Sequence, residues 1–231
     1  MKFSVAMVTY NSVTKIKESL DSVLTQTYQD LEIVVIDGGS TDGTLNIIKN
    51  NEDKIKWISE SDKGIYDAMN KALHIASGDF IIFLGSDDHF ISQDILNTIA
   101  NNIKDLNSVY YGNVLRPLSL DIYCGKYNSF KLAVKNICHQ AIFYPKIVYK
   151  NYEYDISYKL NADYAYNLKL WNKYKYVYIP IVVSYYNQFG VSSGSIDKKF
   201  ENDRYLLTIR SLGFVQYLFS VIYHFLRNLI K

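Results

Sequence analysis

The sequence predicts an α/β protein built on a mostly parallel sheet flanked by helices. Over residues 1–90, short runs of β-branched residues alternate with longer segments whose apolar residues recur at helical spacing, the pattern of a parallel sheet. Polar loops at 9–11, 37–42 and 85–88 directly follow three of the expected strands. Because ligands of open parallel sheets bind beyond the carboxyl ends of the strands, we expect these loops to meet in one crevice.

The first half is expected to alternate strands and helices. Strands are expected at 3–8, 31–36, 56–59 and 80–84. Helices are expected at 14–24, 44–49 and 65–76, and Gly78 gives the last of them a C-terminal stop.

After residue 90 the periodicity is looser. We expect helices at 93–103 and 162–173 and strands at 109–113, 141–144 and 176–183. No internal repeat, low-complexity tract or Pro/Gly-rich linker interrupts residues 1–190. The sequence therefore predicts one domain over residues 1–195, with halves at 1–90 and 91–195, followed by a helical tail at 196–231.

Residues 212–231 predict an amphipathic helix with a narrow polar face and a wide apolar face. The polar face contains Gln216, Ser220, His224, Arg227, Asn228 and Lys231, and the apolar face contains Phe214, Val215, Leu218, Phe219, Val221, Ile222, Phe225, Leu226, Leu229 and Ile230. A wide apolar face edged by cations suits the headgroup region of a membrane better than a span, because the polar stripe runs the whole length. Packing on the domain or on a second subunit is the alternative.

The composition limits the classes of partner that the protein can bind and the cellular compartment in which it is expected. Lys and Arg number 25 against 23 Asp and Glu, a formal net charge of +2, so no overall positive field indicates nucleic-acid binding. Cys124 and Cys138 are too few for a disulfide framework or a four-ligand zinc site, which favours a reducing cytoplasm. The N-terminal apolar run is too short for a secretory signal, so we expect the protein to remain inside the cell.

Asp87 and Asp88 directly follow the apolar strand expected at 80–84. Adjacent carboxylates repel each other unless a cation or hydrogen bonds offset the repulsion. Such oxygen ligands suit Mg²⁺ or Mn²⁺ bridging a diphosphate. A turn or the cap of the next helix would explain the same pair.

A glycine-rich turn, DGGSTDGT at 37–44, leads into the second expected helix. Its backbone N–H groups can approach a ligand closely. The turn lacks the lysine of a P-loop, and its glycines do not fit GxGxxG, so a mononucleotide P-loop and a dinucleotide fold are both disfavoured.

Together with several other segments, this turn resembles glycosyltransferase family 2, whose members have the GT-A fold. The resemblance rests on VTYN (8–11), SVLTQTY (22–28), VIDGGSTDGT (35–44), ESDKGIYDAMNK (60–71), SGD (77–79) and SDD (86–88), with CHQ (138–140) and NADY (161–164) beyond residue 90. It implies a Rossmann-like GT-A catalytic domain that binds a nucleotide sugar, expected to be a UDP-sugar, through residues 1–90 and the acceptor through residues 91–195.

The resemblance also implies roles for individual residues. Thr9, Tyr10 and Asp37 would line the nucleoside pocket, with Asp62 and Asn70 nearby. Asp87 would contact the ribose or the metal, and Asp88 would hold Mn²⁺ or Mg²⁺. Asp163 falls where the family has its catalytic base. His139 is a candidate acceptor residue, although a lone histidine is more often structural.

Two positions depart from the family pattern. Many relatives have a second acidic residue, which helps to read the nucleotide base, where this chain has Gly38. The Asp-x-Asp motif of the family begins here with Ser86, which leaves Asp88 as the expected metal ligand.

The expected chemistry agrees with these roles. An acceptor hydroxyl is too weakly acidic to ionise at neutral pH, so a carboxylate must take its proton as it attacks the anomeric carbon, and direct attack inverts that carbon. A divalent ion at Asp88 would stabilise the charge on the departing diphosphate. We expect Asp163 in the first turn of its helix, where the dipole favours a carboxylate, with Asp155 and Glu153 as the next candidates.

We therefore expect an inverting, metal-dependent glycosyltransferase that extends a glycan or lipid-linked glycan in surface polysaccharide biosynthesis, in the cytoplasm or peripherally on the inner face of the cell membrane. A sugar nucleotidyltransferase is one alternative, but it would have a glycine-rich basic loop where this chain has TYNS at 9–12. A catalytically silent glycan-binding or assembly module is another, and the intact Asp37, Asp88 and Asp163 argue against it.

Overall fold

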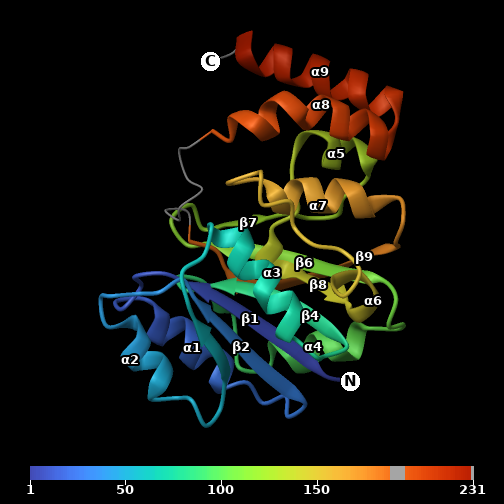
Figure 1. The fold of residues 1–231 in the computed structure, drawn as a ribbon. Coiled ribbons are helices and arrows are strands. Elements are labelled where there is room, and N and C mark those ends of the chain that lie inside the picture. The colour runs from blue at the N-terminus through green and yellow to red at the C-terminus, as the bar shows by residue number, and fades with distance from the viewer. Residues whose placement is uncertain (188–195, 230–231) are drawn as a thin grey trace.

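The computed structural model describes residues 1–187 and 196–229, without the side chain of Asn228. Its central feature is a nine-stranded sheet in the order β3-β2-β1-β4-β8-β6-β9-β5, with β7 paired to β6 (Figure 1). The N-terminal half of this order, β3-β2-β1-β4, is entirely parallel. The α/β architecture expected from the sequence is confirmed.

The parallel strands end in register. They are β1 (Phe3–Thr9), β2 (Leu31–Asp37), β3 (Lys56–Ser59) and β4 (Phe80–Gly85). Thr9 pairs with Asp37, and Asp37 pairs with Ser59. Val8 pairs with Gly85 on the other side of β1. The polar segments that follow these strands therefore start from one edge of the sheet.

The second half of the sheet is mixed. Strand β8 (Ile142–Pro145) runs antiparallel to both β4 and β6 (Val109–Arg116), and β9 (Tyr176–Tyr185) lies parallel to β6. The short strands β5 (His89–Phe90) and β7 (Asp121–Tyr123) were not expected from the sequence, nor were the short helices α5 (Ser129–Val134) and α6 (Lys146–Tyr149).

Helices cover both faces of the sheet. The helices α1 (Ile16–Leu24), α2 (Thr44–Lys49) and α4 (Ile95–Asn102) bury apolar side chains in the core on one face. The helices α3 (Ile65–Ile75), α5 and α7 (Ala162–Trp171) do so on the other. Because α3 and α7 share this second core, they bring residues from the two halves of the domain together.

An ionic cluster surrounds Glu32 at the opposite end of the strands from the polar loops. Its carboxylate accepts hydrogen bonds from the ammonium groups of Lys2 (2.8 Å) and Lys56 (2.9 Å) and from the hydroxyls of Ser4 (2.5 Å) and Ser77 (2.6 Å). Burial alone would raise the pKa of Glu32, but the hydrogen bonds from Lys2, Ser4 and Ser77 outweigh it and hold the pKa well below its usual value. The cluster joins β1, β2, β3 and the segment before β4.

The tail expected to be helical over 196–231 contains two helices. Helix α9 (Phe214–Leu229) accounts for most of the amphipathic helix expected at 212–231, and α8 (Lys198–Leu212), whose bounds were not predicted, precedes it. Gly213 separates them with a φ of 105°, a left-handed value that glycine adopts without strain. No helix among the described residues is long and apolar enough to cross a membrane. The domain boundary expected at residue 195, and Lys231 on the expected polar face, lie outside the described residues.

Candidate active site

The three polar loops contact one another at the carboxyl edge of the parallel strands, as expected. The backbone N–H of Asn11 donates to the Ser40 hydroxyl (2.8 Å), and the Asn11 side-chain oxygen accepts from the N–H of Thr41 (2.9 Å). The hydroxyls of Ser86 and Ser12 are 2.9 Å apart and join the third loop to the first.

Asp37 organises the glycine-rich turn. It is fully buried, and its carboxylate accepts from the N–H of Ser40 (3.0 Å), the hydroxyl of Ser59 (2.6 Å) and the hydroxyl of Ser40. These bonds hold the carboxylate at the end of β2 and tie the turn to β3. A contact between Asp37 and the nucleoside stays a prediction.

The space above Gly38 is taken by side chains from other loops. A Cβ at residue 38 would lie 2.6 Å from Oδ2 of Asp62 and 3.3 Å from Cδ2 of Tyr10. Asp62 is held by the N–H of Gly64, which donates to its Oδ1 (2.9 Å). The carboxylate of Asp62 thus occupies the space that a side chain at residue 38 would need.

Two other predicted nucleoside residues differ in their surroundings. The hydroxyl oxygen of Thr9 is buried and has no hydrogen-bond partner among the described residues. Asn70 uses both ends of its amide on the backbone of Tyr154, donating to its carbonyl (2.9 Å) and accepting from its N–H (2.8 Å). These bonds give Asn70 a part in holding the segment before α7, and its contact with a nucleoside stays a prediction.

The carboxylates of Asp87 and Asp88 converge over Gly85. A Cβ at Gly85 would lie 2.7 Å from Oδ2 of Asp88 and 3.1 Å from Oδ1 of Asp87. Asp88 accepts from the amide of Gln140 (2.9 Å) and from the N–H of Asn187 (2.9 Å). Asp87 accepts from the side chain of Asn187 (2.9 Å), and Lys15 lies 3.5 Å away. Only a glycine at residue 85 leaves both carboxylates room in this arrangement.

The electrostatics of this pair fit a divalent cation. Burial raises the pKa of Asp88, the N–H of Asn187 and the amide of Gln140 lower it, and the charge of Asp87 raises it, with a net increase. The described residues contain no group of three or more acidic, His or Cys side chains placed to hold a metal. Mg²⁺ is usually bound by one or two carboxylates plus substrate phosphates, and Asp87 and Asp88 would fit such an ion beside a diphosphate.

Asp163 lies in the first turn of α7 and is nearly buried. Its carboxylate accepts from the Tyr66 hydroxyl (2.9 Å) and from the amide of Asn136 (2.8 Å), and Nδ1 of His139 lies 3.3 Å from its Oδ2. Burial lowers the pKa of His139, but the hydrogen bond and charge of Asp163, together with the charge of Asp88, raise it above its usual value.

Residues 139 and 140 connect the two acidic centres. They begin a 3₁₀ turn (His139–Ala141), from which His139 contacts Asp163 while Gln140 contacts Asp88. Gln140 and Asn187 were not predicted as site residues. Gln140 belongs to the CHQ segment (138–140) that resembles the family, which was the sequence signal for it, and nothing local indicated Asn187.

Comparison with known proteins gives the family. A model described as "Glycosyl transferase family 2" matches residues 4–119. A PGL/p-HBAD biosynthesis glycosyltransferase of Mycobacterium tuberculosis is 34% identical over 209 residues, which cover 86% of this chain and 82% of the relative. The chain belongs to glycosyl transferase family 2.

This family 2 enzyme is also similar to one further relative in sequence and to one solved structure in fold. The UDP-Glc:alpha-D-GlcNAc-diphosphoundecaprenol beta-1,3-glucosyltransferase WfgD of Escherichia coli is 39% identical over 112 residues, 48% of this chain and 44% of WfgD. The structure of S. aureus TarS residues 1–349 in complex with UDP-GlcNAc superposes with a TM-score of 0.74 at 21% identity, over 91% of this chain and 66% of that chain. This likeness confirms the GT-A fold.

Proposed function

We propose that this glycosyltransferase transfers a sugar from a nucleoside diphosphate sugar, expected to be a UDP-sugar, to a hydroxyl of a glycan or lipid-linked glycan, with inversion at the anomeric carbon. The name of WfgD, which is 39% identical over 112 residues, specifies UDP-Glc as donor and a diphosphoundecaprenol-linked sugar as acceptor. The buried, unpartnered hydroxyl of Thr9 beside the glycine-rich turn supports a ligand at this edge of the sheet.

The observation that carries the proposal is the link through residues 139 and 140. The same short turn contacts Asp163 through His139 and Asp88 through Gln140. A transferase needs a proton acceptor on one side of the anomeric carbon and charge stabilisation for the leaving group on the other. These two carboxylates supply both from neighbouring positions.

In the proposed reaction, the acceptor oxygen forms a bond to the anomeric carbon as the bond from that carbon to the diphosphate oxygen breaks. The hydroxyl proton passes to the carboxylate of Asp163, and the electron pair leaves with the diphosphate. Tyr66 and Asn136 orient this carboxylate by donating to its two oxygens. Asp87 and Asp88 would hold Mn²⁺ or Mg²⁺, which supplies Lewis-acid stabilisation of the diphosphate.

We place the reaction in the cytoplasm, peripherally on the inner face of the cell membrane, in surface polysaccharide biosynthesis. A reducing compartment is consistent with Cys124 and Cys138, both of which are free thiols. The nearness of a membrane would suit a lipid-linked acceptor.

The test is a panel of UDP- and GDP-sugars, each incubated with Mn²⁺ and a lipid-linked or free glycan acceptor, with the anomeric configuration of the product read by NMR. An inverted glycoside is the expected product. Retention of configuration contradicts the direct displacement. Nucleotide binding without turnover on any donor favours the silent glycan-binding module, and release of diphosphate from a nucleoside triphosphate plus a sugar phosphate favours the nucleotidyltransferase.

A further inference from the structure

Helix α9 packs with its polar residues inward. Ser220 is fully buried, and the side chain of Gln216 donates to the hydroxyl of Ser129 on α5 (3.2 Å). Tyr217 packs edge-to-face on Tyr205 of α8, with ring centroids 6.0 Å apart. His224 has a buried Nε2 with no partner among the described residues. The N-terminal part of the narrow polar face predicted from the sequence is therefore turned toward α5 and α8, and Phe219, at the edge of the apolar face, also packs on Phe130 of α5 with ring centroids 5.3 Å apart.

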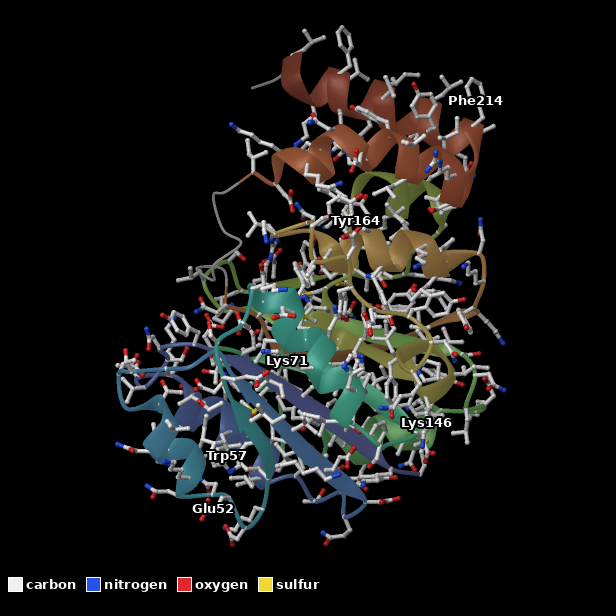
Figure 2. All side chains as sticks on the ribbon, viewed as in Figure 1. Glu52, Trp57, Lys71, Lys146, Tyr164 and Phe214 are labelled. Atoms are coloured by element: carbon white, nitrogen blue, oxygen red, sulfur yellow. The ribbon has the colours of Figure 1, made fainter. Side chains whose placement is uncertain are left out.

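The opposite side of α9 is apolar and faces outward. We call it the α9 apolar face, and it contains Phe214, Leu218, Ile222, Phe225, Leu226 and Leu229. All six side chains are exposed, from 43% for Leu218 to 68% for Leu229. Figure 2 shows Phe214 on the outermost layer, beyond α8 and far from the sheet. A helix on a protein surface normally buries its apolar side, so this reversal indicates that something covers the α9 apolar face.

The charges of α8 and α9 that lack an ion pair among the described residues have one sign. Helix α9 contains no acidic residue. The two acidic residues of α8 are in ion pairs, Glu201 with Arg204 (3.0 Å) and Asp203 with Lys199 (2.7 Å). Three exposed cations of α8 and α9 have no ion pair among the described residues: Lys198, Arg210 and Arg227.

We infer that the α9 apolar face lies in the surface of a lipid bilayer that contains anionic headgroups. Anionic lipids complement the unpaired cations, and exposed aromatic rings such as Phe225 and Tyr223 suit the boundary between headgroups and acyl chains. A second copy of the same face would oppose cations to cations without an acidic partner.

The length of α9 agrees with a helix that lies in the surface. Its 16 residues extend about 24 Å at 1.5 Å per residue, which is shorter than the hydrocarbon core of about 30 Å. Since the polar side is already used by α5 and α8, only one side of the helix is available to lipid. This inference concerns a surface outside the catalytic site and does not depend on the identity of the donor.

The experiment is sedimentation of the full chain with phosphatidylcholine vesicles, with and without phosphatidylglycerol. We expect binding to the anionic vesicles that weakens as salt is raised. The double variant Ile222→Asp/Phe225→Asp should lower the partition coefficient by about tenfold or more, because two exposed apolar side chains that would enter the bilayer are replaced by anions. Arg210→Gln/Arg227→Gln should lower binding to anionic vesicles and leave binding to neutral vesicles unchanged.

The matched control is Leu118→Asp, in the turn between β6 and β7. Leu118 is 66% exposed, close to the 64% of Phe225, and this variant should bind vesicles like the wild type. Circular dichroism and transfer to a water-soluble acceptor should be unchanged in every variant, which separates this inference from the proposed reaction. If the wild type does not sediment with anionic vesicles, the inference is wrong. It is also overturned if ultracentrifugation without lipid shows a dimer that Ile222→Asp/Phe225→Asp dissociates.

Discussion

Nδ1 of His139 lies 3.3 Å from Oδ2 of Asp163, so the predicted acceptor residue and the predicted base are direct neighbours. They are 24 positions apart in the chain, and the pairing depends on the 3₁₀ turn before β8 facing the first turn of α7. The ring of His139 thus contacts the predicted base, and the charge of the buried Asp88 also raises the pKa of His139.

Asp163→Asn should remove the general base and leave nucleotide binding intact. We expect turnover to fall by roughly a hundredfold to ten-thousandfold, the range typical of general-base removal. Asparagine keeps the size of the side chain, so the hydrogen bond with Asn136 can re-form with reversed polarity. Single-turnover kinetics measure the rate of transfer, calorimetry measures the affinity for UDP, and a thermal melt measures stability.

The matched controls are Asp155→Asn and Glu153→Gln, the other carboxylates near the start of α7. Asp155 caps a local turn by accepting from the N–H of Ser157 (2.9 Å), and Glu153 is exposed beside His74 (2.6 Å). Both variants should retain near-normal turnover. If either loses as much as Asp163→Asn, or if Asp163→Asn stays active, the base has been misassigned.

Binding of UDP should depend on a divalent ion. Without one, a diphosphate would face Asp87 and the buried Asp88, and like charges at this range repel strongly. We expect calorimetry to show at least about tenfold weaker binding in EDTA than in Mn²⁺. Asp88→Asn should abolish that difference, whereas Asp30→Asn, an exposed change, should preserve it. Equal affinities with and without EDTA in the wild type would disprove the metal assignment.

Gly38→Ala should weaken nucleotide binding through Asp62. The new Cβ would lie 2.6 Å from Oδ2 of Asp62, at the far end of a side chain that can rotate away. We therefore expect a small change in melting temperature and a fall of about tenfold in UDP affinity, within the coupling usual for residues in contact. In an Asp62→Ala background the same substitution should have little effect. An equal loss in both backgrounds would show that Asp62 does not mediate it.

Glu32→Gln should destabilise the fold by about 1–3 kcal/mol near neutral pH, since it replaces a buried charged acceptor of several hydrogen bonds. The folded-state pKa of Glu32 is depressed, so its contribution is fully present above the unfolded pKa, about 4.3, and is lost as the pH falls through the folded pKa. Urea unfolding of the wild type and of Glu32→Gln should give a difference in the free energy of unfolding that shrinks below about pH 4.

The exposed Glu52→Gln is the control, and it should match the wild type at every pH. A difference between Glu32→Gln and the wild type that stays constant down to acid pH would mean that the charge of Glu32 is not what stabilises the cluster.

The first ninety residues could be predicted closely because their signals are local. The strands ending at Thr9, Asp37 and Gly85 each combine an apolar run with polar residues at its end, and parallel pairing then fixes their common edge. Helix α8 lacked such a signal, since its apolar residues do not gather on one side. The short strand β5 depends on β9, far along the chain, whereas β7 pairs locally with the end of β6 and was missed because it is only three residues long.

The parts of the candidate site that were missed depend on distant contacts. The role of Gln140 comes from Asp88, 52 positions away, and that of Asn187 from Asp87, 100 positions away. The same limit applies to α9. Its periodicity defines two faces, but which face points inward is decided by contacts with distant residues, such as that between Gln216 and Ser129, 87 positions apart.

Helices α7, α8 and α9 form successive layers above the sheet, with α7 packed on α8 and α8 on α9 (Figure 1). Tyr164, next to Asp163, packs on Phe200 of α8 with ring centroids 5.1 Å apart. The packing of α7 on α8 and of α8 on α9 thus sets the height of the Asp163 carboxylate beneath the outer surface of α9. An enzyme bound to a bilayer through that surface would select acceptors by the distance of their reactive sugar from the membrane. Glycans whose reactive sugar lies closer to the membrane, or which are already extended, would not reach the carboxylate.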